Sequence, residues 1–142
     1  MKRSILVSSL GVCILIFVGK QKISEIGILL PLSGNVDQIG GALLDSIQLA
    51  FFEVLNLNAE LLIFDTRGTV EGAKQAAELA INSGVDLILG PLFGGSTKAI
   101  APMTKEAGII LISFSNDHLV AQEGVYVFGF LPSQQIKRIV NF

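Results

Sequence analysis

Five short apolar runs punctuate the sequence, at residues 25–30, 61–65, 86–89, 109–113 and 126–130. Each is too short for a helix and ends at or close to a glycine, a proline or a polar residue. Unbroken apolar runs of this length are typical of strands that are covered on both faces, as in parallel sheets. We therefore predict five strands.

Between the runs, apolar residues recur every three or four positions, as on one face of an amphipathic helix. The first such helix is expected to begin near Ala42, with Leu43 and Ile47 on its apolar face. Thr69 is placed to cap a second helix and Gly84 to end it. The spacing predicts that each helix packs on the sheet through its apolar face.

A third helix is expected from Thr97 to Ala107, ended by Gly108. Pro102 falls too far inside this helix to be a first-turn proline, so we expect a kink or a restart there. A fourth helical pattern starts at Gln134 and is cut off at the end of the chain. Strand and helix therefore alternate along the sequence.

This alternation, with short connections, predicts an α/β fold in which helices cover both faces of a parallel sheet. Right-handed crossovers favour a doubly wound sheet of about five strands in the order 2-1-3-4-5. The loops at the carboxyl ends of such strands gather on one edge of the sheet. These loops carry the candidate ligand-binding residues, which are Ser33, Gly34, Gly94, Gly95, Ser96, Thr97, Ser113, Ser115 and Asn116.

Two interpretations of these glycines and hydroxyl residues remain open. Backbone N–H groups at the start of the third helix, from Gly94 to Thr97, could hold a carboxylate, and Ser115 and Asn116 could orient it. Alternatively, the same residues cap helices and form turns. The pattern fits both interpretations.

The charge distribution argues against nucleic-acid binding. The chain has 142 residues, enough for one packed domain, and a formal net charge of −2. From Lys20 onward, eight basic residues stand against twelve acidic ones, a balance of −4. No basic face is left for a phosphate backbone.

The N-terminus has the pattern of an export signal. Lys2 and Arg3 are followed by sixteen uncharged residues, from Ser4 to Gly19. A helix of that length covers about 24 Å, which is short of the ~30 Å hydrocarbon core of a bilayer. We predict that residues 1–22 form a signal peptide or an uncleaved N-terminal membrane anchor, and that residues 23–142 form the exported domain.

Cys13 lies inside the apolar part of this segment and is the only cysteine in the sequence, so no internal disulfide forms. It is either a site of lipid attachment or a small hydrophobic residue, and the preceding Leu10-Gly11-Val12 matches a lipoprotein signal poorly. Contact with a membrane is expected only through the N-terminal segment.

The sequence lacks the motifs of common enzyme classes. Gly90 and Gly95 have the spacing of a phosphate-binding loop, but Lys98 comes two positions too late. His118 is the only histidine, and no Gly-x-Ser-x-Gly motif surrounds a serine. Single acids do not make a metal site. Asp65 is expected to organise its own loop by accepting backbone N–H bonds or by pairing with Arg67. We therefore expect no catalytic residue, metal ion or cofactor, and binding rather than turnover.

Four segments resemble the N-terminal lobe of type I periplasmic binding proteins, the leucine/isoleucine/valine-binding superfamily. They are residues 26–34 (IGILLPLSG), 64–68 (FDTRG), 89–92 (LGPL) and 113–117 (SFSND). The segment GVYVFGFLP at residues 124–132, with Gln134 and Gln135, is similar to the penicillin-binding protein activator branch of that superfamily.

This resemblance implies one lobe of a two-lobed protein of the periplasm that closes over a ligand without catalysing a reaction. In amino-acid-binding members, a serine-bearing turn after the third strand meets the ligand carboxylate, and a small residue and a threonine after the fourth strand complete the site. Gly94 occupies the position of that serine here, and the second turn, from Ser113 to Asn116, lacks the threonine. Both departures suit the branch that regulates peptidoglycan synthases by protein contact.

The expected function is therefore that of an exported, non-enzymatic penicillin-binding protein activator that contacts a peptidoglycan synthase. The alternatives are the amino-acid-binding protein of an ABC transporter, with a small amino-acid-like ligand, and a phosphate- or nucleotide-binding α/β enzyme. The resemblance covers the N-terminal lobe only, so we expect an incomplete lobe that binds weakly alone. We also expect an exposed apolar patch where later segments would pack.

Overall fold

A computed structural model describes residues 25–53 and 59–129 of the chain, which form a five-stranded sheet flanked by helices. The strands are β1 (Glu25–Leu30), β2 (Glu60–Asp65), β3 (Leu87–Leu89), β4 (Ile110–Ser113) and β5 (Val125–Val127). Every neighbouring pair of strands is parallel, and their order is β2-β1-β3-β4-β5. The predicted α/β class, strand number and strand order are confirmed.

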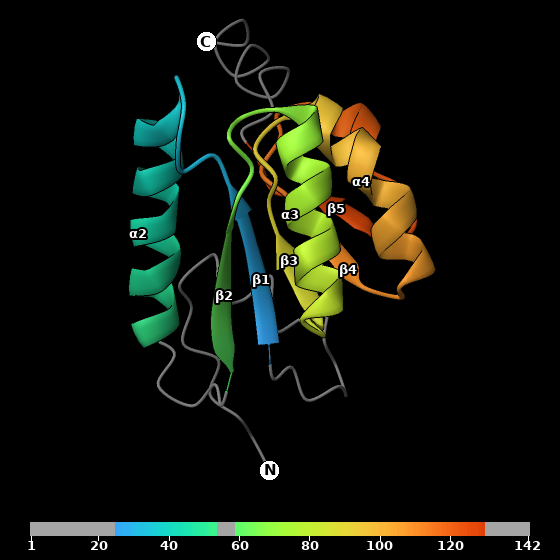
Figure 1. The fold of residues 1–142 in the computed structure, drawn as a ribbon, viewed down its shortest axis with the longest axis horizontal. Helices are drawn as coiled ribbons and strands as arrows, with labels where there is room; N and C mark the ends of the chain where they lie inside the picture. Colours follow the sequence, from blue (N-terminus) through green and yellow to red (C-terminus); the bar gives the residue numbers. More distant parts are fainter. Residues whose placement is uncertain (1–24, 54–58, 130–142) are drawn as a thin grey trace, which may run out of the picture.

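The helices lie on both faces of this sheet, as a doubly wound fold requires. They are α2 (Asp37–Glu53), α3 (Val70–Asn82) and α4 (Gly94–Glu106), and a short 3₁₀ helix, η1 (His118–Val120), precedes β5. Helix α2 lies on one face of the sheet, and α3 and α4 lie together on the opposite face (Figure 1). No helix in the described ranges is long and apolar enough to cross a membrane.

The face under α3 and α4 is closely packed. Helix α3 turns four alanines toward the sheet, each at most 2% exposed: Ala73, Ala76, Ala77 and Ala80. They pack with Leu29, Ile88 and Leu111 of the strands in one buried cluster. Small side chains let a helix approach a sheet closely, so the predicted helix has its apolar stripe against the core.

The face under α2 is covered less completely. Ile26, Ile28 and Leu30 of β1 are buried there with Ile47 of α2. Farther across the same face, however, apolar residues at the β4–β5 side are only partly buried, among them Ile110, Tyr126 and Phe128. An apolar strip of the sheet therefore remains accessible beside α2.

Two predicted helix starts were wrong. Helix α2 begins at Asp37 rather than near Ala42, and the backbone N–H of Gly40 already donates to the carbonyl oxygen of Val36. Helix α4 begins at Gly94 rather than Thr97. Glycines obscured both starts, because a glycine is a poor helix former unless tertiary contacts favour it.

The restart expected at Pro102 was wrong, because α4 runs through this residue to Glu106, while the alternative of a kink stays a prediction. Pro102 is exposed to solvent. On the solvent side of a helix, water can bond to the carbonyl oxygen that a proline leaves without a donor. Phe130, the end of the predicted fifth strand, and the helix predicted from Gln134 lie outside the described residues.

Asp65 joins the loop that follows β1 to the loop that follows β2. Its Oδ1 atom accepts hydrogen bonds from the backbone N–H of Leu32 at 2.9 Å and of Arg67 at 2.8 Å. Its Oδ2 atom accepts a hydrogen bond from the hydroxyl of Ser33. Partial burial acts to raise the pKa of the Asp65 carboxyl, but the hydrogen bonds from Ser33, Arg67 and Leu32 outweigh it and hold that pKa below its ordinary value. The predicted role of Asp65 in its own loop is confirmed.

Two adjacent glycines of α2 test how closely this helix packs on the end of β1. A Cβ atom at Gly40 would lie 1.9 Å from the carbonyl oxygen of Pro31, whereas a Cβ atom at Gly41 would meet nothing within 4 Å. We expect Gly40→Ala to lower the free energy of unfolding by about 1–3 kcal/mol through overpacking. Gly41→Ala, the matched control, should raise it by about 0.5–1 kcal/mol through helix propensity. Urea denaturation of both variants measures this difference, and equal effects would contradict the close approach.

Asp65 also predicts a pH dependence of stability. Because its pKa is lower in the folded chain than in the unfolded chain, the stabilisation is present above the unfolded value and is lost as pH falls through the folded one. Asp65→Asn should remove part of the stability that the wild type loses between about pH 5 and pH 2, at most about 1 kcal/mol because solvent screens the partly exposed carboxyl. The exposed Asp45 of α2 provides the control, since Asp45→Asn should keep the wild-type dependence of the free energy of unfolding on pH. Urea unfolding curves across this pH range measure the effect. If Asp65→Asn keeps the wild-type pH dependence, Asp65 is not the source of this stabilisation.

Candidate functional site

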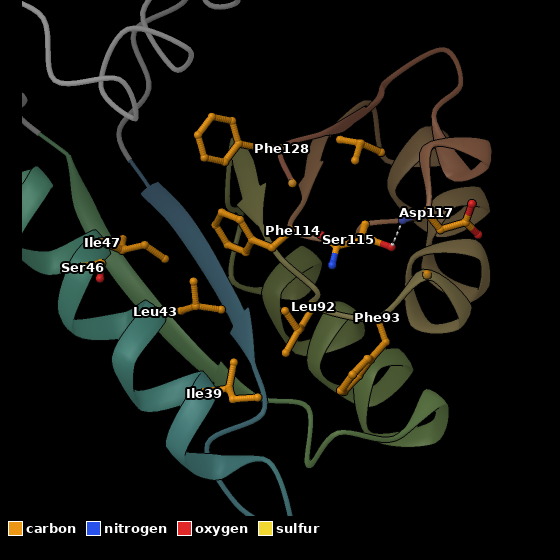
Figure 2. A pocket seen from close by; sticks show the side chains of 14 residues that line it. Ile39, Leu43, Ser46, Ile47, Leu92, Phe93, Phe114, Ser115, Asp117 and Phe128 are labelled. Carbon is orange, nitrogen blue, oxygen red and sulfur yellow. Dashed lines mark hydrogen bonds between the residues drawn. The ribbon is translucent and has the colours of Figure 1, made fainter. Parts of the chain in front are cut away.

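A groove opens where the carboxyl ends of β3, β4 and β5 face helix α2 (Figure 2). Its cavity volume is about 750 Å³, within the usual range of ligand pockets. Fourteen residues line it: Ile39, Leu43, Ser46, Ile47, Leu92, Phe93, Gly94, Phe114, Ser115, Asn116, Asp117, Val127, Phe128 and Gly129. It lies at the edge of the sheet where the carboxyl-end loops were predicted to gather.

The groove has an apolar body and one polar corner. Leu43 and Ile47 of α2 point toward Leu92 and Phe114 across it, while Asp117 lies at the far end (Figure 2). The polar corner consists of the start of α4 and the turn after β4. An apolar cavity with a few convergent polar groups is the usual form of a small-molecule site.

Three of the nine predicted site residues line this groove, namely Gly94, Ser115 and Asn116. Ser33 and Gly34 do not line it, and they lie instead in the loop after β1, where the hydroxyl of Ser33 is bonded to Asp65. Gly95 is exposed in the first turn of α4 and also lies outside the groove lining. All of these residues belong to loops or helix starts at the same edge of the sheet.

The three other predicted residues do not line the groove and, like Ser115, are buried. Ser96, Thr97 and Ser113 are at most 3% exposed. The hydroxyl oxygens of Thr97 and Ser113 are 2.7 Å apart, and the Ser113 hydroxyl is also 3.1 Å from the carbonyl oxygen of Pro91. The backbone N–H of Ser115 donates to the same Ser113 oxygen at 3.1 Å. For Thr97 and Ser113, this arrangement favours the turn-forming interpretation, and ligand contact by any of the nine residues stays a prediction.

Gly94 lets the turn after β4 come close to the first turn of α4. A Cβ atom at this position would lie 3.1 Å from the Cβ atom of Asp117 and 3.2 Å from both Asp117 Oδ2 and Ser115 Oγ. A side chain there would push both residues away. The absence of a side chain at Gly94 therefore shapes the polar corner.

Asp117 is held in this corner by several contacts. Its backbone N–H donates to Ser115 Oγ at 3.0 Å, and its Oδ1 atom accepts from the N–H of Leu119 at 3.0 Å, which caps η1. Its Oδ2 atom is 3.3 Å from Lys98 Nζ. The hydrogen bond from Leu119 lowers the pKa of the Asp117 carboxyl, with a smaller contribution from Lys98, and together they outweigh the opposing effect of burial. The carboxyl is therefore ionised at neutral pH.

Sequence reasoning missed Asp117 and most of the apolar lining. Phe93 is 39% exposed and Ile39 is 53% exposed, which is unusual for large apolar side chains in a compact domain. Ile39 precedes the predicted start of the first helix, so its place on α2 was not recognised. For Asp117, the available signal was an acid two residues after Ser115 in a loop that follows a buried strand.

The described part of the chain holds no group of three or more His, Cys, Asp or Glu side chains arranged to bind a metal ion. Helix α4 starts after Phe93, which makes no side-chain capping bond to it. Backbone N–H groups of its first turn therefore lie near the polar corner.

Comparison with known proteins identifies relatives of this chain. The sequence model of the periplasmic binding protein family matches residues 24–142. An uncharacterised protein of Rickettsia prowazekii (strain Madrid E) is 29% identical over 123 residues, which cover 87% of this chain and 33% of that protein.

Two solved structures extend the likeness to the fold. The leucine-binding protein LivK from Thermotoga maritima has a TM-score of 0.68 and 28% identity, over 74% of this chain and 32% of that one. The branched-chain amino acid transporter substrate-binding protein LivJ from Streptococcus pneumoniae, solved with isoleucine, has a TM-score of 0.67 and 25% identity, over 76% of this chain and 33% of that one. This chain spans about one third of the length of these relatives.

The family match covers most of the chain, and the sheet order and helix arrangement agree with one lobe of such proteins. The chain therefore belongs to the periplasmic binding protein family, in the type I superfamily, and corresponds to its N-terminal lobe.

Proposed function

We propose that this chain is the N-terminal lobe of an exported, non-enzymatic binding protein and forms one wall of a cleft for a small solute. The observation that carries the proposal is the groove at the carboxyl ends of the strands, which joins an apolar body to a polar corner at Gly94, Ser115 and Asn116. Two similar structures, a leucine-binding protein and a substrate-binding protein solved with isoleucine, support a small and largely apolar solute.

The chemistry of the groove suits such a solute. Its apolar side chains, among them Leu43, Leu92 and Phe114, can pack against a hydrocarbon body. The backbone N–H groups of the first turn of α4 can bond to its polar end. One lobe encloses only one side of a ligand, whereas pockets usually bury about 70–90% of it. Affinity of this lobe alone is therefore expected to be low.

The proposal includes export to the periplasm. Residues 1–22 carry the charged start and uncharged core of a secretion signal, and membership of the periplasmic binding protein family supports the same location. Cleavage of this segment, or its retention as an anchor, stays a prediction.

A second candidate function is contact with a peptidoglycan synthase, as in penicillin-binding protein activators. Two observations at the polar corner favour it over the transport of free amino acids. Gly94 offers no hydroxyl to a ligand, and the ionised carboxylate of Asp117 lies beside it. Both features weaken the binding of a free carboxylate, so a protein partner could replace the solute.

The alternative of a phosphate- or nucleotide-binding α/β enzyme has less support. Lys98, which would have to reach a phosphate group, instead pairs with Asp117 and is 59% exposed. An exposed lysine that is held by a carboxylate is poorly placed to bind a phosphate in the groove.

Two neighbouring glycines provide the test. In nuclear magnetic resonance titrations of the full chain in a mild detergent, isoleucine should shift amide signals at residues 92–94 and 114–117, with a Kd of about 1 mM or weaker. Gly94→Leu should abolish these shifts, because its side chain would enter the space beside Ser115 and Asp117. Gly95→Leu is the control, since a Cβ atom there meets only Val70 Cγ2, at 3.9 Å.

The other outcomes separate the candidate functions. Capture of a peptidoglycan synthase without any solute-induced shift would favour the activator, and shifts caused by ATP would favour the enzyme. Micromolar affinity for isoleucine, measured by calorimetry, would contradict the argument that one lobe binds weakly.

A further inference from the structure

We propose that the polar corner of the groove selects a ligand group that is positively charged or donates hydrogen bonds, and disfavours a carboxylate. The ligand would carry a primary ammonium group on a branched or aromatic hydrocarbon body. This inference rests on the proposed function, since it names the solute class of the same groove. Asp117 is the residue assigned to recognise the ammonium group.

The one charged side chain that lines the groove is a carboxylate. Among its fourteen lining residues, Asp117 is the only one with an ionisable side chain that is charged at neutral pH. Lys98, whose Nζ atom is 3.3 Å from Asp117 Oδ2, is not part of the lining. A ligand entering the groove therefore meets a carboxylate without meeting a lining cation.

The chain's own carboxylate also lies beside the first residue of α4. Helix N-termini attract negative charge through their free N–H groups. Asp117 Oδ2 lies 3.2 Å from the Cβ position of Gly94, the first residue of α4. A ligand carboxylate at this corner would lie next to a like charge, which disfavours its binding.

Asp117 keeps hydrogen-bonding capacity for a donor. A carboxylate offers about four acceptor sites. The described contacts use one for the N–H of Leu119 and one for Lys98 Nζ. The pair with Lys98 is solvent-exposed, with 59% and 37% of the two side chains accessible, so it is weak and open to exchange. A ligand ammonium group can therefore bind Asp117 from the groove side.

Aromatic rings beside this corner favour a cation further. Phe93 and Phe114 line the groove, and Phe114 packs edge-on against Phe128 with ring centroids 6.4 Å apart. The faces of aromatic rings attract cations and also pack against hydrocarbon. An amine with an apolar body matches both parts of the groove.

Three small molecules with similar branched bodies test the inference: isopentylamine, the anion 4-methylpentanoate and neutral isopentanol. We expect isopentylamine to bind the full chain in a mild detergent at least about tenfold more tightly than 4-methylpentanoate, as judged by amide shifts at residues 92–94 and 114–117. Added salt should reduce the preference, because Asp117 is partly exposed.

Variants assign the preference to one side chain. Asp117→Asn keeps an oxygen that can accept from Leu119, so η1 should stay capped while the ratio of the two affinities falls to about one. Asp45→Asn, on the exposed surface of α2 and outside the groove lining, should keep the wild-type ratio.

Each failure has a distinct meaning. If 4-methylpentanoate binds the wild type as well as isopentylamine does, the inference is overturned while the groove remains a solute site. If the amine preference survives in Asp117→Asn, the assignment to Asp117 is overturned. If none of the three molecules, including neutral isopentanol, shifts these signals, the inference is overturned together with the proposed solute site.

Discussion

The parallel pairing of all five strands is the constraint on which the rest of this structure depends. Strands that run in one direction need crossovers, and these place helices on both faces of the sheet. The same pairing brings the loops after β1, β2, β3 and β4 to one edge. The groove and its polar corner are consequences of that gathering, because their residues are distant in sequence and meet only at this edge.

Close backbone approach then shapes the rim. Gly94 brings α4 near the turn after β4, and a Cβ atom at Gly129 would lie 2.4 Å from the carbonyl oxygen of Ser115. Behind this rim, the hydroxyls of Thr97 and Ser113 meet at 2.7 Å and fix the two turns relative to each other. The site is therefore built from small residues at the surface and a buried hydroxyl contact beneath them.

Much of the fold was predictable from sequence, because buried parallel strands have a strong local signature. The run at 25–30 gave the exact bounds of β1, and the right-handed crossover rule gave the strand order. Helix starts were less predictable, since the start of α2 depends on Gly40 packing against Pro31, a tertiary contact. At the site, the positions of the loops predicted Gly94 and Ser115. The apolar side chains that α2 adds to the groove could not be predicted, because the sequence does not show which strand ends this helix faces.

At this edge of the sheet, buried residues hold the loops together while exposed residues line the groove, and this separation has an evolutionary consequence. Ser113 is buried and contacts Thr97, Pro91 and the backbone of Ser115, so changing it would disturb the scaffold. Asn116, in contrast, is exposed on the groove wall and has no comparable buried role. Substitutions at such a surface position can redirect specificity while the framework persists. Lineages sharing this lobe can thus diversify their ligands without first evolving a new fold.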